Sequence, residues 1–302
     1  MRESVDLFHC QGIFDARFTN YVLKAFPAIP LVVSCWGSDV LRTHDIRKLK
    51  HQKKLLYRAN IVTVSSPEFR EIILAKFGQK LRSKIRITQF SPTLDGVLSK
   101  SEHYEAPNFR EKYSISEKKY LIGLAHNGHK DNQHLELIES LGQLSSGKKE
   151  SIHLIVPMTY GGKPLYQREV EDSLKKHHFD FTILDSFLTE EDVVELRCAI
   201  QVFIYAPITD AFSATVSQAL AAGSECILGS WLPYSARVKA GFLYTEIDEP
   251  GGVCEALENV LTNFQSEKSR REKNRECSLA FFSKERLGNE WASVYREAAL
   301  AR

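Results

Sequence analysis

Short apolar runs alternate along this chain with longer segments of helical periodicity. The runs are rich in Val and Ile and are flanked by polar residues or glycine, which is typical of strands buried on both faces of a parallel sheet. Strands that alternate with helices predict an α/β fold. The candidate strands are Val5–His9, Leu31–Ser34, Ile61–Ser65, Ile85–Thr88, Tyr120–Leu124, His153–Val156, Phe181–Leu184, Val202–Ala206 and Cys226–Gly229.

Helical patterns fill the intervals between these strands. They are predicted at about Phe14–Phe26, Asp45–Tyr57, Pro67–Phe77, Asn132–Leu144, Pro164–His177, Glu190–Ala199, Ser213–Ala222, Gly252–Phe264 and Lys284–Ala298. With 302 residues, the chain is long enough for two α/β domains of ordinary size.

The best domain boundary lies in the segment 92–112, which is polar, contains two prolines and lacks periodicity. It separates residues 1–105 from the remainder. The first part offers only four candidate strands, whereas a complete Rossmann half has about six. We therefore expect an N-terminal Rossmann-like domain that is incomplete.

Composition indicates a soluble, cytoplasmic protein. Hydrophobic residues make up 43% and charged residues 26%, no apolar run approaches the ~20 residues that span a bilayer, and the N-terminus lacks the pattern of a signal peptide. The cysteines show no metal-ligand spacing, so we expect buried thiols and no metal site. They are Cys10, Cys35, Cys198, Cys226, Cys254 and Cys277.

The most informative stretch is 202–234. A strand ends at Ala206, a loop carries Asp210, and a short helix ends at Gly223, which suits the left-handed position that closes a helix. The start of this helix then lies at the carboxyl end of a strand, where α/β proteins bind ligands and where free N–H groups favour a phosphate. Alternatively, Asp210 only caps the helix and Gln218 is a solvated helix residue.

This stretch resembles the donor-binding segment of GT-B glycosyltransferases, which reads E-x-F-G-x-x-x-x-E-A-x-A-x-G. The chain has Asp210-Ala-Phe212-Ser213, and then Gln218-Ala-Leu-Ala-Ala-Gly223. The resemblance implies that Asp210, Phe212 and Ser213 lie near the donor sugar. It also implies that Gln218 hydrogen-bonds the ribose hydroxyls, without the charge of the acid that it replaces.

Three further segments resemble, in order, those of transferases that add TDP-linked acetamidodideoxygalactose to the lipid-linked common-antigen precursor. They are the loop 123–134, the segment 156–161 with Tyr166, and the segment 280–283 with Leu287 and Trp291. The chain is similar in a broader sense to family-four glycosyltransferases.

The loop 123–134 contributes candidate donor contacts through this resemblance. Asn127, Gly128 and Lys130 would frame a pyrophosphate, because glycine lets the backbone approach and lysine supplies a point charge. Tyr160, in the second segment, would contact the donor. The loop also holds His126, His129 and His134, which could instead suggest a metal, but the resemblance implies side chains and a helix dipole in place of a divalent ion. A polar, solvated loop is the alternative.

In the first half, the segment 33–40 resembles the strand-end W-G-x-D of polysaccharide glycosyltransferases. Asp39 would then project into the cleft between the domains, as would His9 at the end of the preceding strand. A carboxylate or imidazole placed there deprotonates an acceptor hydroxyl, so Asp39 and His9 are the candidate catalytic residues. Alternatively, Asp39 caps the next helix and His9 orients a group without catalysing.

Residues 1–105 carry 17 Lys and Arg against 10 Asp and Glu, a net charge of +7, whereas the remainder has a net charge of −5. Six of the basic residues fall on the helix predicted at 45–57 or directly after it, which predicts either peripheral contact with an anionic membrane or a solvated face. No recognition motif for nucleic acid accompanies them. These residues are Arg47, Lys48, Lys50, Lys53, Lys54 and Arg58.

The resemblance thus implies a GT-B fold of two Rossmann-like domains with parallel sheets. Residues 1–105 form the acceptor side, residues 106–283 bind the nucleotide sugar, and the helix 284–302 crosses back to the first domain. The expected reaction moves a sugar from a UDP-, TDP- or GDP-sugar to a polysaccharide or lipid-linked saccharide, without a cofactor. Two alternatives are a nucleotide-sugar epimerase and a non-catalytic relative that acts as a partner subunit.

Overall fold

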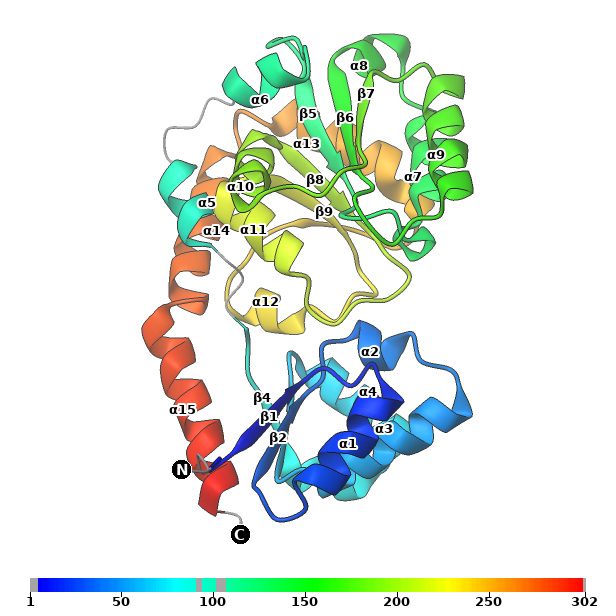
Figure 1. Cartoon of the computed structure of the whole chain (residues 1–302). Helices are drawn as coiled ribbons and strands as arrows, with labels where there is room; N and C mark the ends of the chain where they lie inside the picture. The colour runs from blue at the N-terminus through cyan, green and yellow to red at the C-terminus, as the bar shows by residue number, and fades with distance from the viewer. Residues whose placement is uncertain (1–4, 91–93, 102–106, 301–302) are drawn as a thin grey trace.

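The structure is a computed structural model that describes residues 5–90, 94–101 and 107–300. It consists of two parallel sheets with flanking helices, one above the other, and a helical C-terminus that runs beside both (Figure 1).

The first sheet has four strands that follow chain order. They are β1 (Phe8–Gln11), β2 (Leu31–Ser34), β3 (Ile61–Val64) and β4 (Ile85–Ile87). Successive residues of a strand point to opposite faces. Val33 and Val62 therefore join the core under the helices α1 (Ala16–Ala25), α3 (Ile46–Arg58) and α4 (Pro67–Phe77), while Val32 and Ile61 face α15 (Lys284–Leu300).

The second sheet has six strands in the order β10-β9-β8-β5-β6-β7, all parallel. They are β5 (Tyr120–Leu124), β6 (Ile152–Pro157), β7 (Phe181–Leu184), β8 (Val202–Tyr205), β9 (Glu225–Gly229) and β10 (Thr245–Ile247). The chain builds outward from β5 in one direction and then returns to place β8 on its other side. This reversal makes the carboxyl ends of β5 and β8 the topological switch point, where open α/β sheets bind ligands.

The helices lie between the strands and after the last of them. In the first half they are α1 (Ala16–Ala25), α2 (Ser38–Leu41), α3 (Ile46–Arg58), α4 (Pro67–Phe77) and the 3-10 helix η1 (Gln79–Lys84). From residue 94 to β8 they are α5 (Asp95–Lys100), α6 (Pro107–Lys112), η2 (Lys130–Asn132), α7 (His134–Leu141), α8 (Ser146–Glu150), α9 (Pro164–Lys176) and α10 (Glu190–Ala199). After β8 they are α11 (Ala214–Ala222), α12 (Ser235–Lys239), η3 (Pro250–Gly252), α13 (Val253–Asn263), α14 (Lys268–Phe281) and α15 (Lys284–Leu300).

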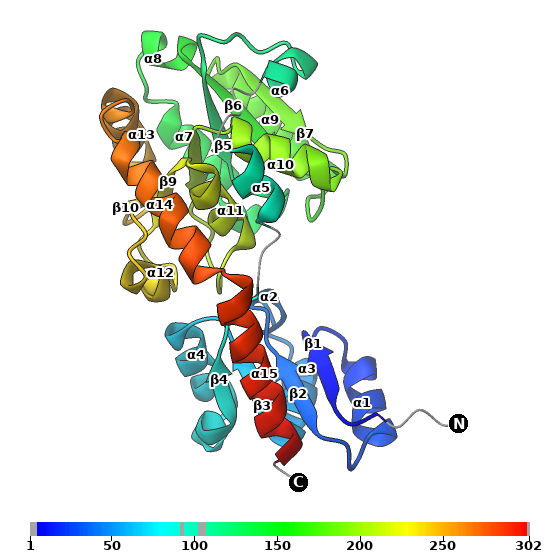
Figure 2. The ribbon, with the colours of Figure 1, turned by 90° about the vertical axis from the view of Figure 1, so that its left-hand side faces the viewer.

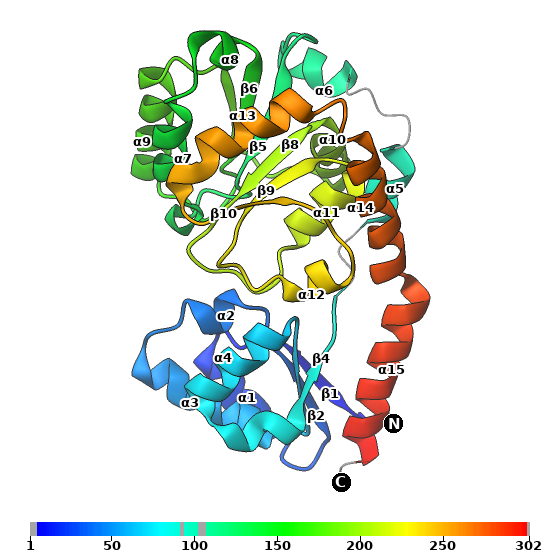
Figure 3. The same cartoon turned by 180° about the vertical axis from the view of Figure 1, so that it is seen from behind.

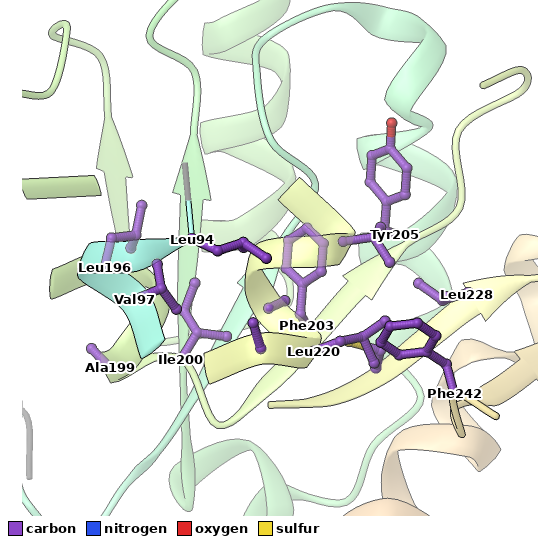
Figure 4. Close-up of a cluster of buried hydrophobic side chains, with 14 of the residues drawn as sticks. Leu94, Val97, Leu196, Ala199, Ile200, Phe203, Tyr205, Leu220, Leu228 and Phe242 are labelled. Atoms are coloured by element: carbon purple, nitrogen blue, oxygen red, sulfur yellow. The ribbon is translucent and has the colours of Figure 1, made fainter. Parts of the chain in front are cut away.

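Helix α5 packs with the second sheet. Its contacts are with α10 and α11, and Leu94 and Val97 join a buried cluster with Phe203 of β8 and Leu220 of α11 (Figure 4). The chain therefore passes from one half to the other before residue 94, ahead of the division at residue 105.

Helix α15 continues from α14 and lies along the first sheet (Figures 2 and 3). It contacts β2 and β3, the indole nitrogen of Trp291 donates to the carbonyl of Gln89 at 3.0 Å, and Arg86 pairs with Glu297. The end of the chain thus contributes to the core of its first half.

Candidate functional site

A cleft of about 510 Å³ lies between the two halves. Its walls come from the loops that follow β2, β3 and β4 in the first half, and β5 and β8 in the second, so the carboxyl ends of both sheets face it. The switch point of the second sheet therefore opens into this cleft. The lining residues are Cys35, Trp36, Ser38, Arg42, Ser65, Gln89, Phe90, His126, Asn127, Tyr160, Tyr205, Asp210, Phe212, Ser213, Ala214, Thr215 and Ser217.

Helix α11 begins at the cleft. The Ser213 hydroxyl caps its first turn by accepting from the backbone N–H of Val216 at 3.3 Å, and Gly223 closes the helix in the left-handed conformation with φ +84°, as the sequence predicts. The first N–H groups of α11 thus lie at the wall of the cleft, where a helix N-terminus favours a negatively charged group.

Asp210 provides the one carboxylate among the described residues that line this cleft. The Tyr234 hydroxyl donates to it. Burial raises the pKa of Asp210, while the hydrogen bond from Tyr234 and the nearby charge of Arg237 lower it. Arg237 of α12 in turn donates to the Ser213 carbonyl at 2.8 Å and stacks on the ring of Phe212. These contacts hold the loop that carries Asp210 against α12.

The first half contributes aromatic rings and one guanidinium to the cleft. Trp36 is 52% exposed, and its ring stacks on Phe90 with centroids 4.9 Å apart. Phe90 in turn contacts Trp291 of α15. Arg42 pairs with Asp131 of the second half at 3.2 Å, which ties the two walls together.

The structure brings Asp210, Phe212, Ser213, Asn127 and Tyr160 together around the cleft. Asn127 is 4% exposed, and its side-chain oxygen accepts from the backbone N–H of His129 and from the amide of Asn132. Asn127 therefore has two roles: it stabilises its loop through these hydrogen bonds, and it lines the cleft. Tyr160 is 50% exposed and packs beside Phe187.

Lys130 and Gly128 lie elsewhere. Both line a separate hollow of about 300 Å³ between η2 and the start of α9. An added Cβ on Gly128 would lie 2.9 Å from the Cα of Gly162, so this glycine permits two loops to approach each other. Neither residue lines the cleft, so the prediction that they frame a pyrophosphate with Asn127 stays a prediction.

Gln218 also faces away from the cleft. It lies one turn into α11, lines a cavity of about 500 Å³ between α5, α10 and α11, and accepts from the Nε of Arg197 at 3.3 Å. Because the helix turns between Ser213 and Gln218, the side chain of Gln218 points to the side of α11 that faces α10.

Asp39 does not project into the cleft, so this expectation was wrong. The side chain is 1% exposed, and its carboxylate accepts from the backbone N–H groups of Ile13, Trp36 and Gly37 at 2.9–3.0 Å. Three convergent donors hold it inside the turn after β2. Asp39 therefore fixes the turn that presents Trp36 to the cleft.

His9 lies under α15 and outside the cleft lining. Its ring bonds the hydroxyls of Ser34 at 2.7 Å and Tyr295 at 3.0 Å, and it packs against Trp291 with centroids 5.2 Å apart. Burial lowers the pKa of His9 to about 4. Because α15 covers β1 at this point, the imidazole orients side chains between strand and helix.

Two residues that the sequence did not assign to the donor site lie at it; His126 was considered there only as a possible metal ligand, and Arg197 was not considered. His126 lines the cleft directly after β5, and burial lowers its pKa to about 3. Arg197 lies on α10 behind it. Arg197 stands next to Leu196 on the face of α10 that packs inward, so a charged residue at an apolar position was the signal that could have identified it.

The three histidines of the 123–134 loop do not converge. Nε2 of His126 bonds the Asn127 amide, His129 pairs with Asp131, and His134 bonds the Tyr166 hydroxyl. Across the described parts of the chain, no three His, Cys, Asp or Glu side chains are grouped as a metal site would require. No described helix is long and apolar enough to cross a membrane.

Comparison by sequence gives no match to a protein-family model and none to a curated protein. Comparison by structure gives close matches at low identity. Sucrose-phosphate synthase from Thermosynechococcus elongatus superposes with a TM-score of 0.81, at 14% identity, over 100% of this chain and 75% of its own. Anabaena HepE in complex with UDP and glucose gives a TM-score of 0.80, at 14% identity, over 96% of this chain and 78% of its own.

A glycosyltransferase from Rickettsia africae gives a TM-score of 0.78, at 14% identity, over 97% of this chain and 77% of its own. At this identity the likeness shows the fold. The alignments span nearly all of the chain, and the two parallel sheets face each other across a cleft. The chain therefore has the GT-B fold, with two Rossmann-like halves of which the first has a sheet of four described strands.

Proposed function

We propose that this chain is a glycosyltransferase that moves a sugar from a nucleoside diphosphate sugar to a saccharide or lipid-linked saccharide. The observation that carries the proposal is the cleft itself. The switch point of the second sheet, the start of α11 and Asp210 meet there, opposite an aromatic wall from the first half. Anabaena HepE, which has the same fold, is described with UDP and with UDP-glucose, and this supports a nucleotide-sugar donor.

In this proposal, the second half holds the donor. The N–H groups at the start of α11 face the leaving diphosphate and stabilise its charge, and Asp210 accepts hydrogen bonds from sugar hydroxyls. The acceptor lies against Trp36 and Phe90. Rate acceleration then comes from positioning the two substrates and from stabilising the departing diphosphate. The sequence likeness to common-antigen transferases supports a lipid-linked acceptor.

Binding of donor nucleotides tests this proposal directly. A ligand that binds only the folded state stabilises it by about 2.7 kcal/mol at 100 times its Kd, so UDP, TDP or GDP should raise the melting temperature of the full chain. Asp210→Asn should then weaken binding of the intact nucleotide sugar more than binding of the free diphosphate. The absence of any shift with all three diphosphates would remove the proposal.

A second candidate function is that of a non-catalytic partner subunit. It is favoured by the placement of Asp39 and His9, since neither predicted catalytic group lies in the cleft. Release of free diphosphate from UDP-, TDP- and GDP-sugars, with and without saccharide acceptors, separates the two. Binding without turnover under every condition would favour the partner subunit.

We also propose that α3 docks the chain on an anionic membrane, at the cytoplasmic face. Five of the six basic residues singled out in the sequence are exposed, and several of them line one surface hollow with Tyr57. Arg58 differs, because it donates to the carbonyls of Phe26 and Ile29. The exposed five are Arg47, Lys48, Lys50, Lys53 and Lys54.

Pelleting with phosphatidylserine vesicles tests this docking. Each Lys near an anionic surface contributes about 1 kcal/mol, so changing four to Gln should release the chain. The changes are Lys48, Lys50, Lys53 and Lys54 to Gln. The control removes the same charge from exposed positions of the second half: Lys118, Lys175, Lys176 and Lys273 to Gln. Equal pelleting of both variants would contradict the proposal.

A further inference from the structure

Three described arginines are buried, and they differ in how their charge is compensated. Arg237 is fully buried, interacts with the charge of Asp210, donates two hydrogen bonds and stacks on Phe212. Arg110 is 9% exposed and donates to the carbonyls of Ser116 and Lys119 and to the side chain of Gln201. A buried charge is costly unless a counter-ion or acceptors compensate it. Arg237 has the charge of Asp210 nearby, although its Nε has no partner among the described residues, and Arg110 has three acceptors.

Arg197 differs from both. It is 6% exposed, its one described acceptor is the neutral amide oxygen of Gln218, and its Nη1 has no hydrogen-bond partner among the described residues. The guanidinium lies 5.8 Å from the ring centroid of Phe203. No described carboxylate contributes to its pKa, which burial lowers.

The position of Arg197 relates it to the donor site. Gln218, which it contacts, lines the cavity between α5, α10 and α11. The ring of Phe203, which the guanidinium approaches, stacks on Tyr205, and Tyr205 packs against His126. Tyr205 and His126 both line the cleft. Arg197 is therefore buried in the wall between these two spaces, beside the carboxyl ends of β5 and β8.

His126 extends the same pattern. Its Nε2 lies 2.8 Å from the Asn127 amide nitrogen. When that amide donates, the proton of the neutral ring lies on Nδ1, which is buried and has no partner among the described residues. Burial and the charge of Arg197 both favour the neutral ring. Two unpaired donors, one on a cation and one on a neutral ring, thus lie behind the same wall of the cleft.

We propose that Arg197 is a positioning residue of the donor site, whose uncompensated guanidinium supplies the positive charge that favours a diphosphate over an uncharged ligand. A buried cation acts through low-dielectric surroundings, where salt screens it little. It acts together with the N-terminus of α11 and leaves the nucleoside to be bound by other groups. This inference rests on the proposed donor function.

The test compares a diphosphate with its own nucleoside, for example UDP with uridine, on the full chain. Arg197→Gln removes the charge and leaves a shorter, neutral side chain whose amide can still donate a hydrogen bond. We expect affinity for the diphosphate to fall about tenfold or more, in keeping with the loss of one charge-assisted interaction, while affinity for the nucleoside stays within twofold. Arg197→Lys should restore part of the preference.

A second variant acts without touching Arg197. Gln218→Glu places a carboxylate against the guanidinium and should lower the ratio of diphosphate to nucleoside affinity in the same direction. It decides the matter if Arg197→Gln does not fold. Arg110→Gln is the matched control. It removes a comparably buried arginine that lies at the amino ends of β5 and β8, away from the cleft. Its ratio should equal that of the unchanged chain.

The outcomes separate two failures. If the unchanged chain binds no diphosphate and no nucleoside, the donor function fails, and the inference fails with it. If the unchanged chain prefers the diphosphate and Arg197→Gln or Gln218→Glu keeps that preference, only the role of Arg197 is overturned. A purely structural role would lower both affinities together and leave their ratio unchanged.

Discussion

Gly37 lies where the two halves approach each other closely, beside Ala211. Its φ is +111°, and an added Cβ would lie 2.6 Å from the Cβ of Ala211 in the second half. The N–H of Gly37 donates to the buried carboxylate of Asp39. A single residue thus sets both the turn after β2 and the width of the cleft beside Phe212.

Gly37→Ala should therefore destabilise the chain and widen the cleft. A side chain at such a backbone conformation costs of order 1–3 kcal/mol, and the contact with Ala211 forces one half to move. Urea denaturation gives the free energy of unfolding, and nucleotide affinity reports the cleft. Gly147→Ala, at a position with nothing within 4 Å, is the control. Equal stability and affinity of the two variants would contradict this reading.

The sequence predicts where a loop lies more readily than it predicts the direction in which each side chain of the loop points. A loop that follows a buried strand must reach the carboxyl edge of its sheet, and Asp210, Ser213 and Tyr160 accordingly line the cleft. Which way a side chain turns depends on partners that are distant in sequence. Asp39 turns inward because the N–H of Ile13 meets it, and no spacing in the sequence encodes that contact.

Among the elements, those with an apolar pattern were predicted and those without were missed. β2, β5 and β7 have the predicted bounds, and the remaining predicted strands differ by a few residues at their ends. Helix α14 was missed because it buries only Asn274, Cys277 and Ser278, which leaves no apolar stripe to detect. β10 was missed because its three residues include one exposed glutamate.

Helix α15 is the element that joins the halves, and Trp291 is its main contact. The indole donates to the Gln89 carbonyl and packs against Phe90 and His9. Trp291→Ala should lower the free energy of unfolding by about 3 kcal/mol, the lower end for a large aromatic residue because the ring is only partly buried. Hydrogen exchange should quicken in β1 and β4 of the first half.

Leu300→Ala, on the same helix at a side chain that is 84% exposed, is the control for this change. Its exchange rates should match those of the unchanged chain. Faster exchange of the Trp291 variant confined to residues 107–283 would mean that the ring does not hold the first sheet.

The whole molecule should lose stability in mild acid. Burial lowers the pKa of His126 to about 3 and that of His134 to about 4, so the unfolded chain binds more protons than the folded one between those values and about 6.5. The free energy of unfolding therefore falls as pH drops through this window, by about 1.4 kcal/mol per pH unit for each such histidine. His9 and His153 shift in the same direction.

Urea denaturation between pH 7.5 and pH 5 measures this dependence. His134→Asn should reduce the slope, because it removes one of the groups that protonate on unfolding. Stability that stays constant, or rises, on acidification would show that these rings are not held neutral in the folded chain.

The first half cannot complete its packing during synthesis until α15 has been made. Arg86 and Glu297 are 211 residues apart, so at about 5–20 residues per second roughly 10–40 s of translation separate them. During that interval, the face of β2 and β3 that packs on Val294 and Ala298 has been synthesised but not yet covered. A ribosome stalled before the final 17-residue helix would present an apolar sheet surface, which is a target for chaperones and a hazard for aggregation.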